Sequence, residues 1–262
     1  MNVLDMFRLN GRTAIVTGGA GRYGKQIVEA LGEAGATVFI ASRDLGKCEE
    51  TAAKFRAAGL DVRALQLDLA EKASIDRMIS AAVGITGRID ILVNNAVTRS
   101  ACTGWEQDLE NYDVSLHVNA SSMFYITAAV ARVMQKQHSG SIINIGSFMG
   151  LVGPEFANYE GTDMGKDPSP IYFYEKGGMV NFTRWAASVL GRDNIRVNAI
   201  HPGGLQESHL PEAFVKNYSA RTQLGRLANQ EDLKGIMVFL ASDASSYLTG
   251  TNIPVDGGYT AK

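Results

Sequence analysis

Apolar and polar positions follow two different periods along this chain, and the two periods alternate. Short runs of consecutive apolar residues predict buried strands, and each run except the last precedes a stretch with the apolar spacing of one helix face. The predicted strands cover residues 12–17, 37–41, 62–67, 89–93, 141–145, 196–200 and 252–255. The predicted helices cover residues 27–34, 45–58, 73–85, 109–117, 121–137 and 231–241, and one more opens at Tyr172.

This alternation of strand and helix predicts an α/β fold with a doubly wound parallel sheet of about seven strands and helices on both faces. No linker, repeat or shift in composition divides the 262 residues, so we expect a single domain over residues 1–262. Ligands of such sheets bind at the carboxyl ends of the strands, where the winding reverses. Those strand ends are therefore the places to look for chemistry.

Composition narrows the class of protein. The formal net charge of −2 argues against a nucleic-acid binder, and the first ten residues lack the pattern of a signal peptide. No long uninterrupted apolar run predicts a membrane span. The cysteines, Cys48 and Cys102, form no Cys-x-x-Cys motif, which favours a reducing, cytoplasmic location. The four histidines lack metal-ligand spacing, so we expect no metal site.

A glycine-rich stretch, Thr17-Gly18-Gly19-Ala20-Gly21-Arg22-Tyr23-Gly24, follows the first predicted strand and leads into a helix. Small residues let the backbone approach a pyrophosphate, and a helix N-terminus offers free N–H groups to it. The alternative is an ordinary strand-to-helix turn. Its place in the first strand–helix–strand unit favours a dinucleotide site that includes Gly18, Arg22, Tyr23 and Gly24.

The next two strand ends bear on the type of dinucleotide. The second strand ends at Ser42 and Arg43, where an acidic residue would bind the 2′-hydroxyl of NAD. A hydroxyl and a guanidinium instead favour the 2′-phosphate of NADP(H), with NAD(H) as the alternative. Asp68 and Leu69 close the third strand, where Asp68 either accepts from an adenine amino group or caps the turn. Arg43 would otherwise be a solvated surface charge.

Tyr172 and Lys176 stand four positions apart in the helix that follows a Gly- and Pro-rich loop, and so share one face of it. An ammonium beside a phenol favours the phenolate, which suits a general acid or base. A Tyr-x-x-x-Lys spacing also arises by chance, so the pair is weak evidence by itself.

Taken in order, the motifs resemble those of the short-chain dehydrogenase/reductases over almost the whole chain. The matching positions are Thr17, Gly18, Gly24, Asp68, Asn94, Asn95, Ala96, Asn119, Ser147, Tyr172, Lys176, Pro202, Gly203 and Val255–Gly258. The resemblance implies a Rossmann-like fold and NAD(P)-dependent interconversion of an alcohol and a carbonyl on a small-molecule substrate. It also implies a homotetramer or homodimer.

The resemblance assigns roles to individual residues. Tyr172 would exchange the proton with the substrate oxygen, and Lys176 would favour its phenolate and bind the nicotinamide ribose. Ser147 would bind the substrate oxygen, and Asn119 would hold a water near Lys176. The cofactor would also contact Asn95, Ala96, Pro202, Gly203 and Leu205. These last positions would otherwise be ordinary turn residues.

Three positions depart from the family pattern. Arg22 replaces the middle glycine of the glycine motif, Val97 replaces a glycine after Asn-Asn-Ala, and Glu207 stands where Thr or Ser is usual. These changes put the geometry of cofactor binding in question. They also motivate an alternative in which the chain is a non-catalytic, dinucleotide-binding regulator.

The loop before Tyr172 is the largest departure, because 25 positions separate Ser147 from Tyr172 and many family members use a shorter connection. We interpret residues 150–170 as a substrate-loop insertion in which Tyr159 contacts the substrate. The loop resembles a sub-branch of bacterial sugar and flagellin-modification oxidoreductases, which implies a sugar, polyol or sugar-acid substrate. A 3-oxoacyl thioester reductase, with the same catalytic positions, remains the alternative.

Overall fold

A computed structural model describes residues 2–98, 104, 109–165 and 168–261, so Cys102 lies outside the described residues. The strands are β1 (Thr13–Thr17), β2 (Thr37–Ser42), β3 (Val62–Gln66), β4 (Ile91–Asn94), β5 (Gly140–Ile145), β6 (Ile195–Pro202) and β7 (Asn252–Val255). The helices are α1 (Arg22–Glu33), α2 (Leu45–Ala57), α3 (Lys72–Thr86), α4 (Leu109–Leu116), α5 (Ser122–Gln137), α6 (Pro170–Leu190), α7 (Glu212–Ser219) and α8 (Lys234–Ala241).

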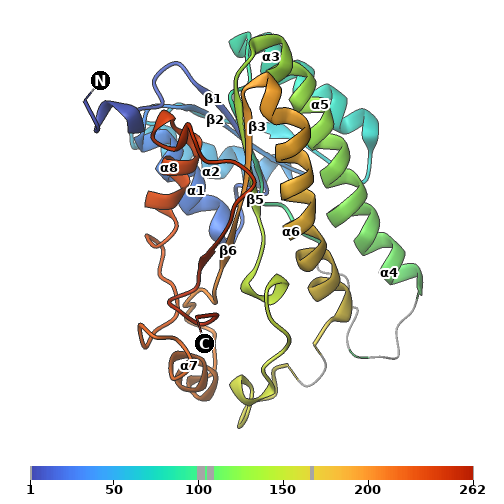
Figure 1. The fold of residues 1–262 in the computed structure, drawn as a ribbon, viewed down its shortest axis with the longest axis vertical. Coiled ribbons are helices and arrows are strands. Elements are labelled where there is room, and N and C mark those ends of the chain that lie inside the picture. The colour runs from blue at the N-terminus through green and yellow to red at the C-terminus, as the bar shows by residue number, and fades with distance from the viewer. Residues whose placement is uncertain (1, 99–103, 105–108, 166–167, 262) are drawn as a thin grey trace.

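The strands form one parallel sheet in the order β3-β2-β1-β4-β5-β6-β7 (Figure 1). The chain winds outward from β1 to β3, then returns to pair β4 with the other side of β1. This reversal leaves the carboxyl ends of β1 and β4 as the switch point of the sheet, where ligands bind in such folds. The predicted doubly wound sheet of seven strands is confirmed.

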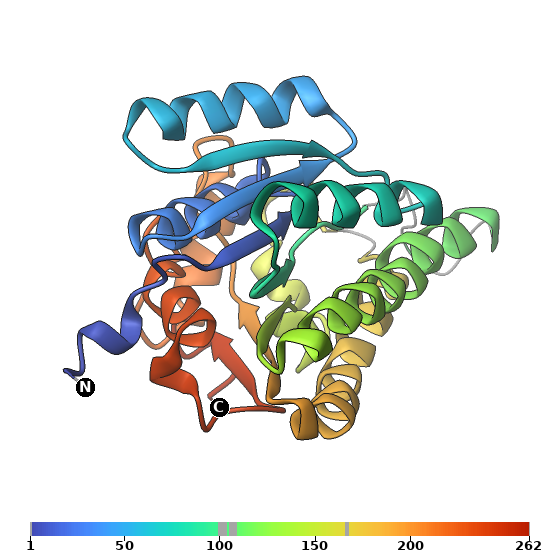
Figure 2. The same ribbon diagram turned by 90° about the horizontal axis from the view of Figure 1, so that it is seen from above.

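Alternation within the strands builds two cores. Ala14 and Val16 of β1 face one core with α1, α2 and α8, whereas Ile15 faces the other with α3, α5 and α6. Figure 2 shows these helices on the two sides of the sheet. Because both faces are covered, the strands read as continuous apolar runs.

The long helix beside β4 differs from its prediction. We expected two separate helices, but α4 continues into α5 through a π-helical turn, His117–Ser121. The Ser122 amide donates a hydrogen bond to the His117 carbonyl at the end of this turn. By length and composition the whole helix, Leu109–Gln137, could cross a membrane, contrary to our expectation. Its α5 part packs Ile126, Val130 and Met134 into the core, so that one helix is weak evidence for a span.

Two other elements differ from prediction. Helix α7 was not predicted, since only Phe214 and Tyr218 of its eight residues are buried. Helix α8 begins at Lys234 rather than at residue 231. The Asn229 side chain there accepts from the Glu231 amide at 2.8 Å, and the Asp232 side chain accepts from the Asn229 amide. These bonds favour a turn before the helix.

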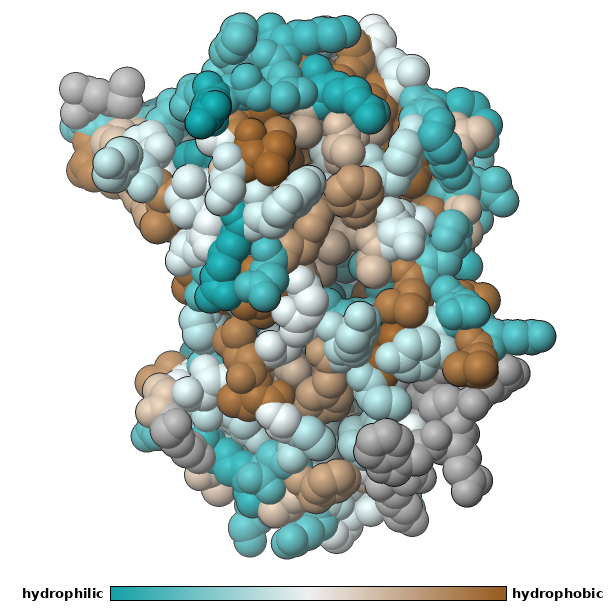
Figure 3. Space-filling view, turned by 45° about the vertical axis from the view of Figure 1, so that its right-hand side comes forward, coloured by the Kyte–Doolittle hydropathy of each residue, from teal (hydrophilic) through white to brown (hydrophobic). Residues whose placement is uncertain are grey.

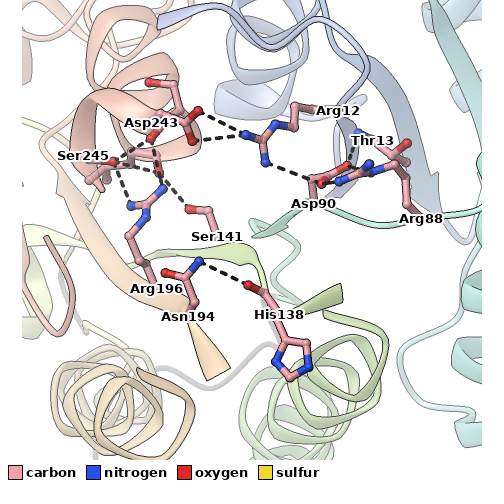
Figure 4. A network of polar contacts seen from close by, with 12 residues as sticks. Arg12, Thr13, Arg88, Asp90, His138, Ser141, Asn194, Arg196, Asp243 and Ser245 are labelled. Atoms are coloured by element: carbon pink, nitrogen blue, oxygen red, sulfur yellow. Dashed lines mark hydrogen bonds and ion pairs between the residues drawn. The ribbon is translucent and has the colours of Figure 1, made fainter. Parts of the chain in front are cut away.

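A polar network closes the amino-terminal end of the sheet, away from the carboxyl ends (Figure 4). The buried Asp90 carboxylate accepts from Arg88 at 2.6 Å and from the Thr13 amide at 2.9 Å. Arg12 lies 3.7 Å from Asp90 and extends the network to Asp243. This network ties the start of β1 to β4 and to the segment after α8.

We expect Asp90→Ala to lower the free energy of unfolding by about 2–4 kcal/mol, because it leaves the Thr13 amide and the Arg88 guanidinium without their acceptor and removes one of the two acidic partners of Arg12. Urea denaturation followed by circular dichroism measures this. Glu50→Ala is the matched control, since Glu50 pairs with Lys54 on the exposed face of α2 and its loss should barely move the midpoint. Equal midpoints for the two variants would contradict the expectation.

Candidate active site

The glycine turn after β1 has the geometry of a phosphate cradle. Gly18 has a φ of +64°, and a Cβ there would meet the Cα of Ala96 at 3.0 Å. A Cβ on Gly24 would meet the Gly18 carbonyl oxygen at 2.3 Å, so only glycine lets α1 pack on the turn. The first turn of α1 has neither a side-chain cap nor an acidic residue. Its free N–H groups therefore fit the pyrophosphate of a dinucleotide.

Arg22 and Glu207, two of the three residues that depart from the family pattern, form an ion pair at this site. Arg22 Nη1 lies 3.2 Å from Glu207 Oε2, so the residue that replaces a glycine pairs with the residue that replaces a hydroxyl. Beside them the Tyr23 hydroxyl donates to the Gly203 carbonyl at 2.7 Å. Burial raises the pKa of Tyr23 well above its usual value, which keeps its phenol protonated. The Arg22–Glu207 ion pair and the Tyr23–Gly203 hydrogen bond thus join the first turn of α1 to the loop after β6.

The residues predicted to bind the adenosine part of the cofactor are held in place by fewer contacts. Arg43 is exposed at the end of β2, and the Ser42 hydroxyl lies 2.9 Å from the Cys48 sulfur. Asp68 Oδ1 accepts from the Ala70 amide at 2.9 Å and so caps its own turn, and its contact with an adenine amino group stays a prediction. Leu69 is buried beside it.

The end of β4 is bound to the glycine turn. The Thr17 hydroxyl accepts from the amides of both Asn95 and Ala96 at 3.0 Å. The Asn95 side chain donates to the carbonyls of Thr17 and Gly18 at 2.9 and 3.0 Å. These bonds fix the switch point between β1 and β4, and they use the Asn95 amide group for structure.

The predicted acid/base pair lies at the end of β5. Pro170 and Ile171 open α6, and Tyr172 follows in its first turn. Lys176 is buried, with Nζ 5.8 Å from the centre of the Tyr172 ring and 2.7 Å from the Ile145 carbonyl, to which it donates. The ammonium is therefore fixed between the phenol and the last residue of β5.

Ser147 lies two positions after Ile145, the last residue of β5, and is also buried. A Cβ on Gly150 would lie 2.5 Å from the Lys176 carbonyl oxygen, so this glycine lets the turn after Ser147 lie directly on α6. Ser147 and the Lys176 side chain thus both lie at the carboxyl end of β5, and the joint action of Ser147, Tyr172 and Lys176 stays a prediction.

His201, which was not predicted as a site residue, contacts the backbone of Ser147. His201 is fully buried in β6, with Nδ1 within 3.3 Å of the Ser147 amide and 3.0 Å of its carbonyl. Gly146 makes room for the ring, since a Cβ there would meet His201 Nδ1 at 2.3 Å. A lone histidine in a strand carries no sequence signal for such a role.

Asn119 lies in the π-helical turn, where its side chain forms two hydrogen bonds with the Thr98 backbone. Thr98 N donates to Oδ1 at 2.8 Å, and Nδ2 donates to the Thr98 carbonyl at 2.9 Å. The loop after β4 is thereby held beside α4 and α5. At the end of β6, Pro202 and Leu205 are buried and the Gly204 amide donates to the Tyr218 hydroxyl at 2.7 Å.

The long loop contacts α7 through an aromatic pair, although most of its described residues before Asn158 are exposed. The Tyr159 ring lies 5.5 Å from that of Phe214, and burial raises the pKa of Tyr159. The buried cluster beside them, which the sequence did not predict as a unit, is Phe148, Phe214, Tyr218, Leu227 and Tyr259. Figure 1 shows α7 and this loop together beyond the carboxyl ends of β5 and β6.

Comparisons with known proteins agree with this geometry. The family model described as enoyl-(acyl carrier protein) reductase matches residues 22–260. The 3-oxoacyl-[acyl-carrier-protein] reductase of Thermotoga maritima is 35% identical, with 96% of this chain and 98% of the relative covered. Cyclopentanol dehydrogenase of Comamonas sp. is 32% identical, with 98% of this chain and 100% of the relative covered.

A solved structure is similar over the full length of both chains. It is a gluconate 5-dehydrogenase from Burkholderia cenocepacia in complex with NADP and tartrate, with a TM-score of 0.87 and 30% identity, and it covers 100% of each chain. This chain therefore belongs to the short-chain dehydrogenase/reductases and is an NAD(P)-dependent oxidoreductase.

Proposed function

We propose that this enzyme interconverts a secondary alcohol and a ketone, with Tyr172 as the general acid/base. The observation that carries the proposal is the anchoring of Lys176 to the Ile145 carbonyl at 2.7 Å, which fixes an ammonium beside the Tyr172 ring. The nicotinamide supplies or accepts the hydride when the cofactor is bound. Ser147 orients the substrate oxygen, and Tyr172 gives it a proton or takes one away.

The residues that hold the cofactor would be those of the glycine turn and the three neighbouring strand ends. Gly18 and Gly24 admit the pyrophosphate, the N–H groups at the start of α1 donate to it, and Ala96 lines the turn. Arg22 stands at the same helix N-terminus, paired with Glu207. We further propose that NADP(H) is preferred, because exposed Arg43 follows β2 where an acidic residue would favour NAD(H).

We expect Arg43→Asp to move the preference toward NAD(H), with the NADP/NAD ratio of kcat/KM falling roughly 10-fold or more, equivalent to about 1.4 kcal/mol. Steady-state kinetics with both cofactors measures the ratio. Arg63→Asp, on the exposed side of β3, controls for the loss of a surface charge. An unchanged ratio in Arg43→Asp would remove Arg43 from the cofactor site.

For the substrate we propose a sugar acid or other polyol. The long loop favours this class, because Asn158 is buried there and donates to the Tyr259 hydroxyl at 2.7 Å. Its carboxamide oxygen has no hydrogen-bond partner among the described residues, which favours a ligand hydroxyl or a water nearby. The similarity to gluconate 5-dehydrogenase supports the same class.

A 3-oxoacyl thioester is the second candidate. The aromatic cluster around Phe148 and Phe214 favours an acyl chain, and the Thermotoga maritima relative is named for that activity. Fluorescence titration with NADPH and NADH, followed by turnover of gluconate, a polyol panel and an acetoacetyl thioester, separates the two. Binding of a cofactor without turnover of any substrate would instead favour a dinucleotide-binding regulator. Failure to bind either cofactor would contradict the proposal that the chain is an enzyme.

We also propose that the chain forms a homo-oligomer through α5 and α6. Phe124, Trp185 and Val189 are about half exposed, and the three rings of Phe124, Phe182 and Trp185 lie 6.1–6.2 Å apart. Figure 3 shows hydrophobic side chains on this side of the molecule. An exposed aromatic group of this kind favours contact with a second protein surface, and a second copy offers the same helices.

We expect Trp185→Glu to shift the protein toward the monomer, because the α5–α6 contact would then bury a carboxylate. Sedimentation or light scattering behind size-exclusion chromatography reports the mass. Tyr247→Glu is the control, since Tyr247 is fully exposed and belongs to the segment after α8 rather than to α5 or α6. A monomeric wild type, or an unchanged mass in Trp185→Glu, would contradict the interface.

A further inference from the structure

Glu175 is a buried carboxylate inside the Tyr172–Lys176 turn, and no role has yet been assigned to it. It is 7% exposed, and each of its two oxygens accepts a hydrogen bond from a different residue. Ser115 Oγ donates to Oε1 at 2.7 Å, and Asn119 Nδ2 donates to Oε2 at 2.9 Å. Burying a carboxylate is costly unless both oxygens are satisfied, and here they are.

The two donors identify what Glu175 holds in place. Ser115 is in the last turn of α4, and Asn119 is in the π-helical turn that follows. A carboxylate only accepts hydrogen bonds, so it turns the amide nitrogen of Asn119 toward α6. The Asn119 oxygen is then left to accept from the Thr98 amide at 2.8 Å, which ties the loop after β4 to the same group.

The first turns of α6 are therefore fixed from two directions. Lys176 anchors them to the end of β5 through the Ile145 carbonyl, and Glu175 anchors them to the π-helical turn. Tyr172 is carried on this doubly held segment. A π-helical turn is an irregular conformation that occurs often at functional sites, and here Glu175 and Thr98 both bind its Asn119.

We propose that Glu175 is a positioning residue that fixes Asn119 and the π-helical turn against α6, beside Tyr172 and Lys176. The inference rests on the proposed function, in which Tyr172 exchanges the proton, and on the water-holding role near Lys176 that the family resemblance implies for Asn119. Glu175 acts through hydrogen-bond geometry, so a side chain of the same shape that still accepts from Asn119 preserves the arrangement.

The test compares Glu175→Ala with Glu175→Gln. Glutamine can accept from Asn119 through its oxygen and donate to Ser115 Oγ through its nitrogen, whereas alanine does neither. We expect Glu175→Ala to lower kcat roughly 10- to 100-fold, since small misplacements of reacting groups have effects of that size. We expect Glu175→Gln to stay within about threefold of the wild type, and NADPH affinity to change less than about threefold in both.

Two further measurements separate positioning from general destabilisation. Asp90→Ala, at the other end of the sheet, should lower the unfolding midpoint without lowering kcat per folded protein. Asn119→Ala combined with Glu175→Ala should be no slower than the slower single variant, because both act through one contact. Hydrogen exchange of the amides of residues 118–122 should accelerate in Glu175→Ala and not in Glu175→Gln, whether or not turnover is measured.

The outcomes that overturn the inference are distinct from failure of the proposed function. Unchanged kcat in Glu175→Ala overturns it, as does a Glu175→Gln variant that is as slow as Glu175→Ala. Unchanged exchange in the π-helical turn of Glu175→Ala also overturns it. A wild type that binds neither NADPH nor NADH contradicts the proposed function itself, whereas a wild type that binds and turns over leaves the Glu175 result to decide the inference alone.

Discussion

Tyr172→Phe should reduce kcat roughly 10²- to 10⁴-fold while cofactor affinity stays nearly unchanged, because the change removes the proton donor and keeps the ring. The phenyl group still fits the first turn of α6, and Lys176 still donates to the Ile145 carbonyl. Stopped-flow or steady-state kinetics on the best substrate, with NADPH titration by fluorescence, measures the two effects separately.

Two tyrosines serve as controls for this variant. Tyr174→Phe removes a hydroxyl two positions later from a side chain that is 67% exposed, and it should leave kcat unchanged. Tyr159→Phe removes the hydroxyl of the long loop, whose pKa burial raises. A Tyr172→Phe variant with normal kcat, together with an inactive Tyr159→Phe variant, would assign the proton exchange to the loop instead.

The parts of the molecule that could be predicted depend on local pattern. Strands buried on both faces and helices with one apolar face have distinct periods, so all seven strands were predicted from the sequence. The Tyr172–Lys176 pair was also predictable, because residues four apart on a helix are neighbours whatever the rest of the chain does.

The parts that could not be predicted depend on contacts between distant segments. The Arg22–Glu207 pair joins two loops that are far apart in sequence, and neither residue alone indicates the other. The π-helical turn at Asn119 is set by Glu175 and Thr98, which belong to other elements. No residue propensity marks such a turn, so we predicted two helices where one continues.

The buried aromatic cluster beside the site could not be predicted for the same reason. Phe148, Phe214 and Tyr259 come from the turn after β5, from α7 and from the segment after β7, and they meet only in the folded chain. We predicted a substrate-loop insertion from the length of the loop and from its resemblance to a sub-branch of sugar oxidoreductases. The structure adds contacts of this loop with α7 through Tyr159 and Phe214, and with the C-terminal segment through Asn158 and Tyr259.

Gly24→Ala should weaken NADPH binding roughly 10- to 100-fold, which corresponds to about 1.4–2.8 kcal/mol. The added Cβ would lie 2.3 Å from the Gly18 carbonyl oxygen and 2.8 Å from two backbone atoms of Gly19, none of which is the end of a flexible side chain. Helix α1 cannot retreat from the turn easily, because Ile27 and Leu31 are fully buried in the core. The glycine turn must therefore distort, and it loses the geometry that admits a pyrophosphate.

Gly84→Ala is the matched control for this substitution. Gly84 lies in α3, where an added Cβ meets no atom within 4 Å, so alanine should stabilise the helix by about 0.5–1 kcal/mol and leave NADPH affinity unchanged. Equal circular dichroism spectra for the two variants would show that Gly24→Ala still folds. A folded Gly24→Ala variant with wild-type affinity would mean that the dinucleotide does not bind at this turn. Weakened binding of ADP with unchanged binding of adenosine would place the lost contacts at the pyrophosphate, because the two ligands differ only in that group.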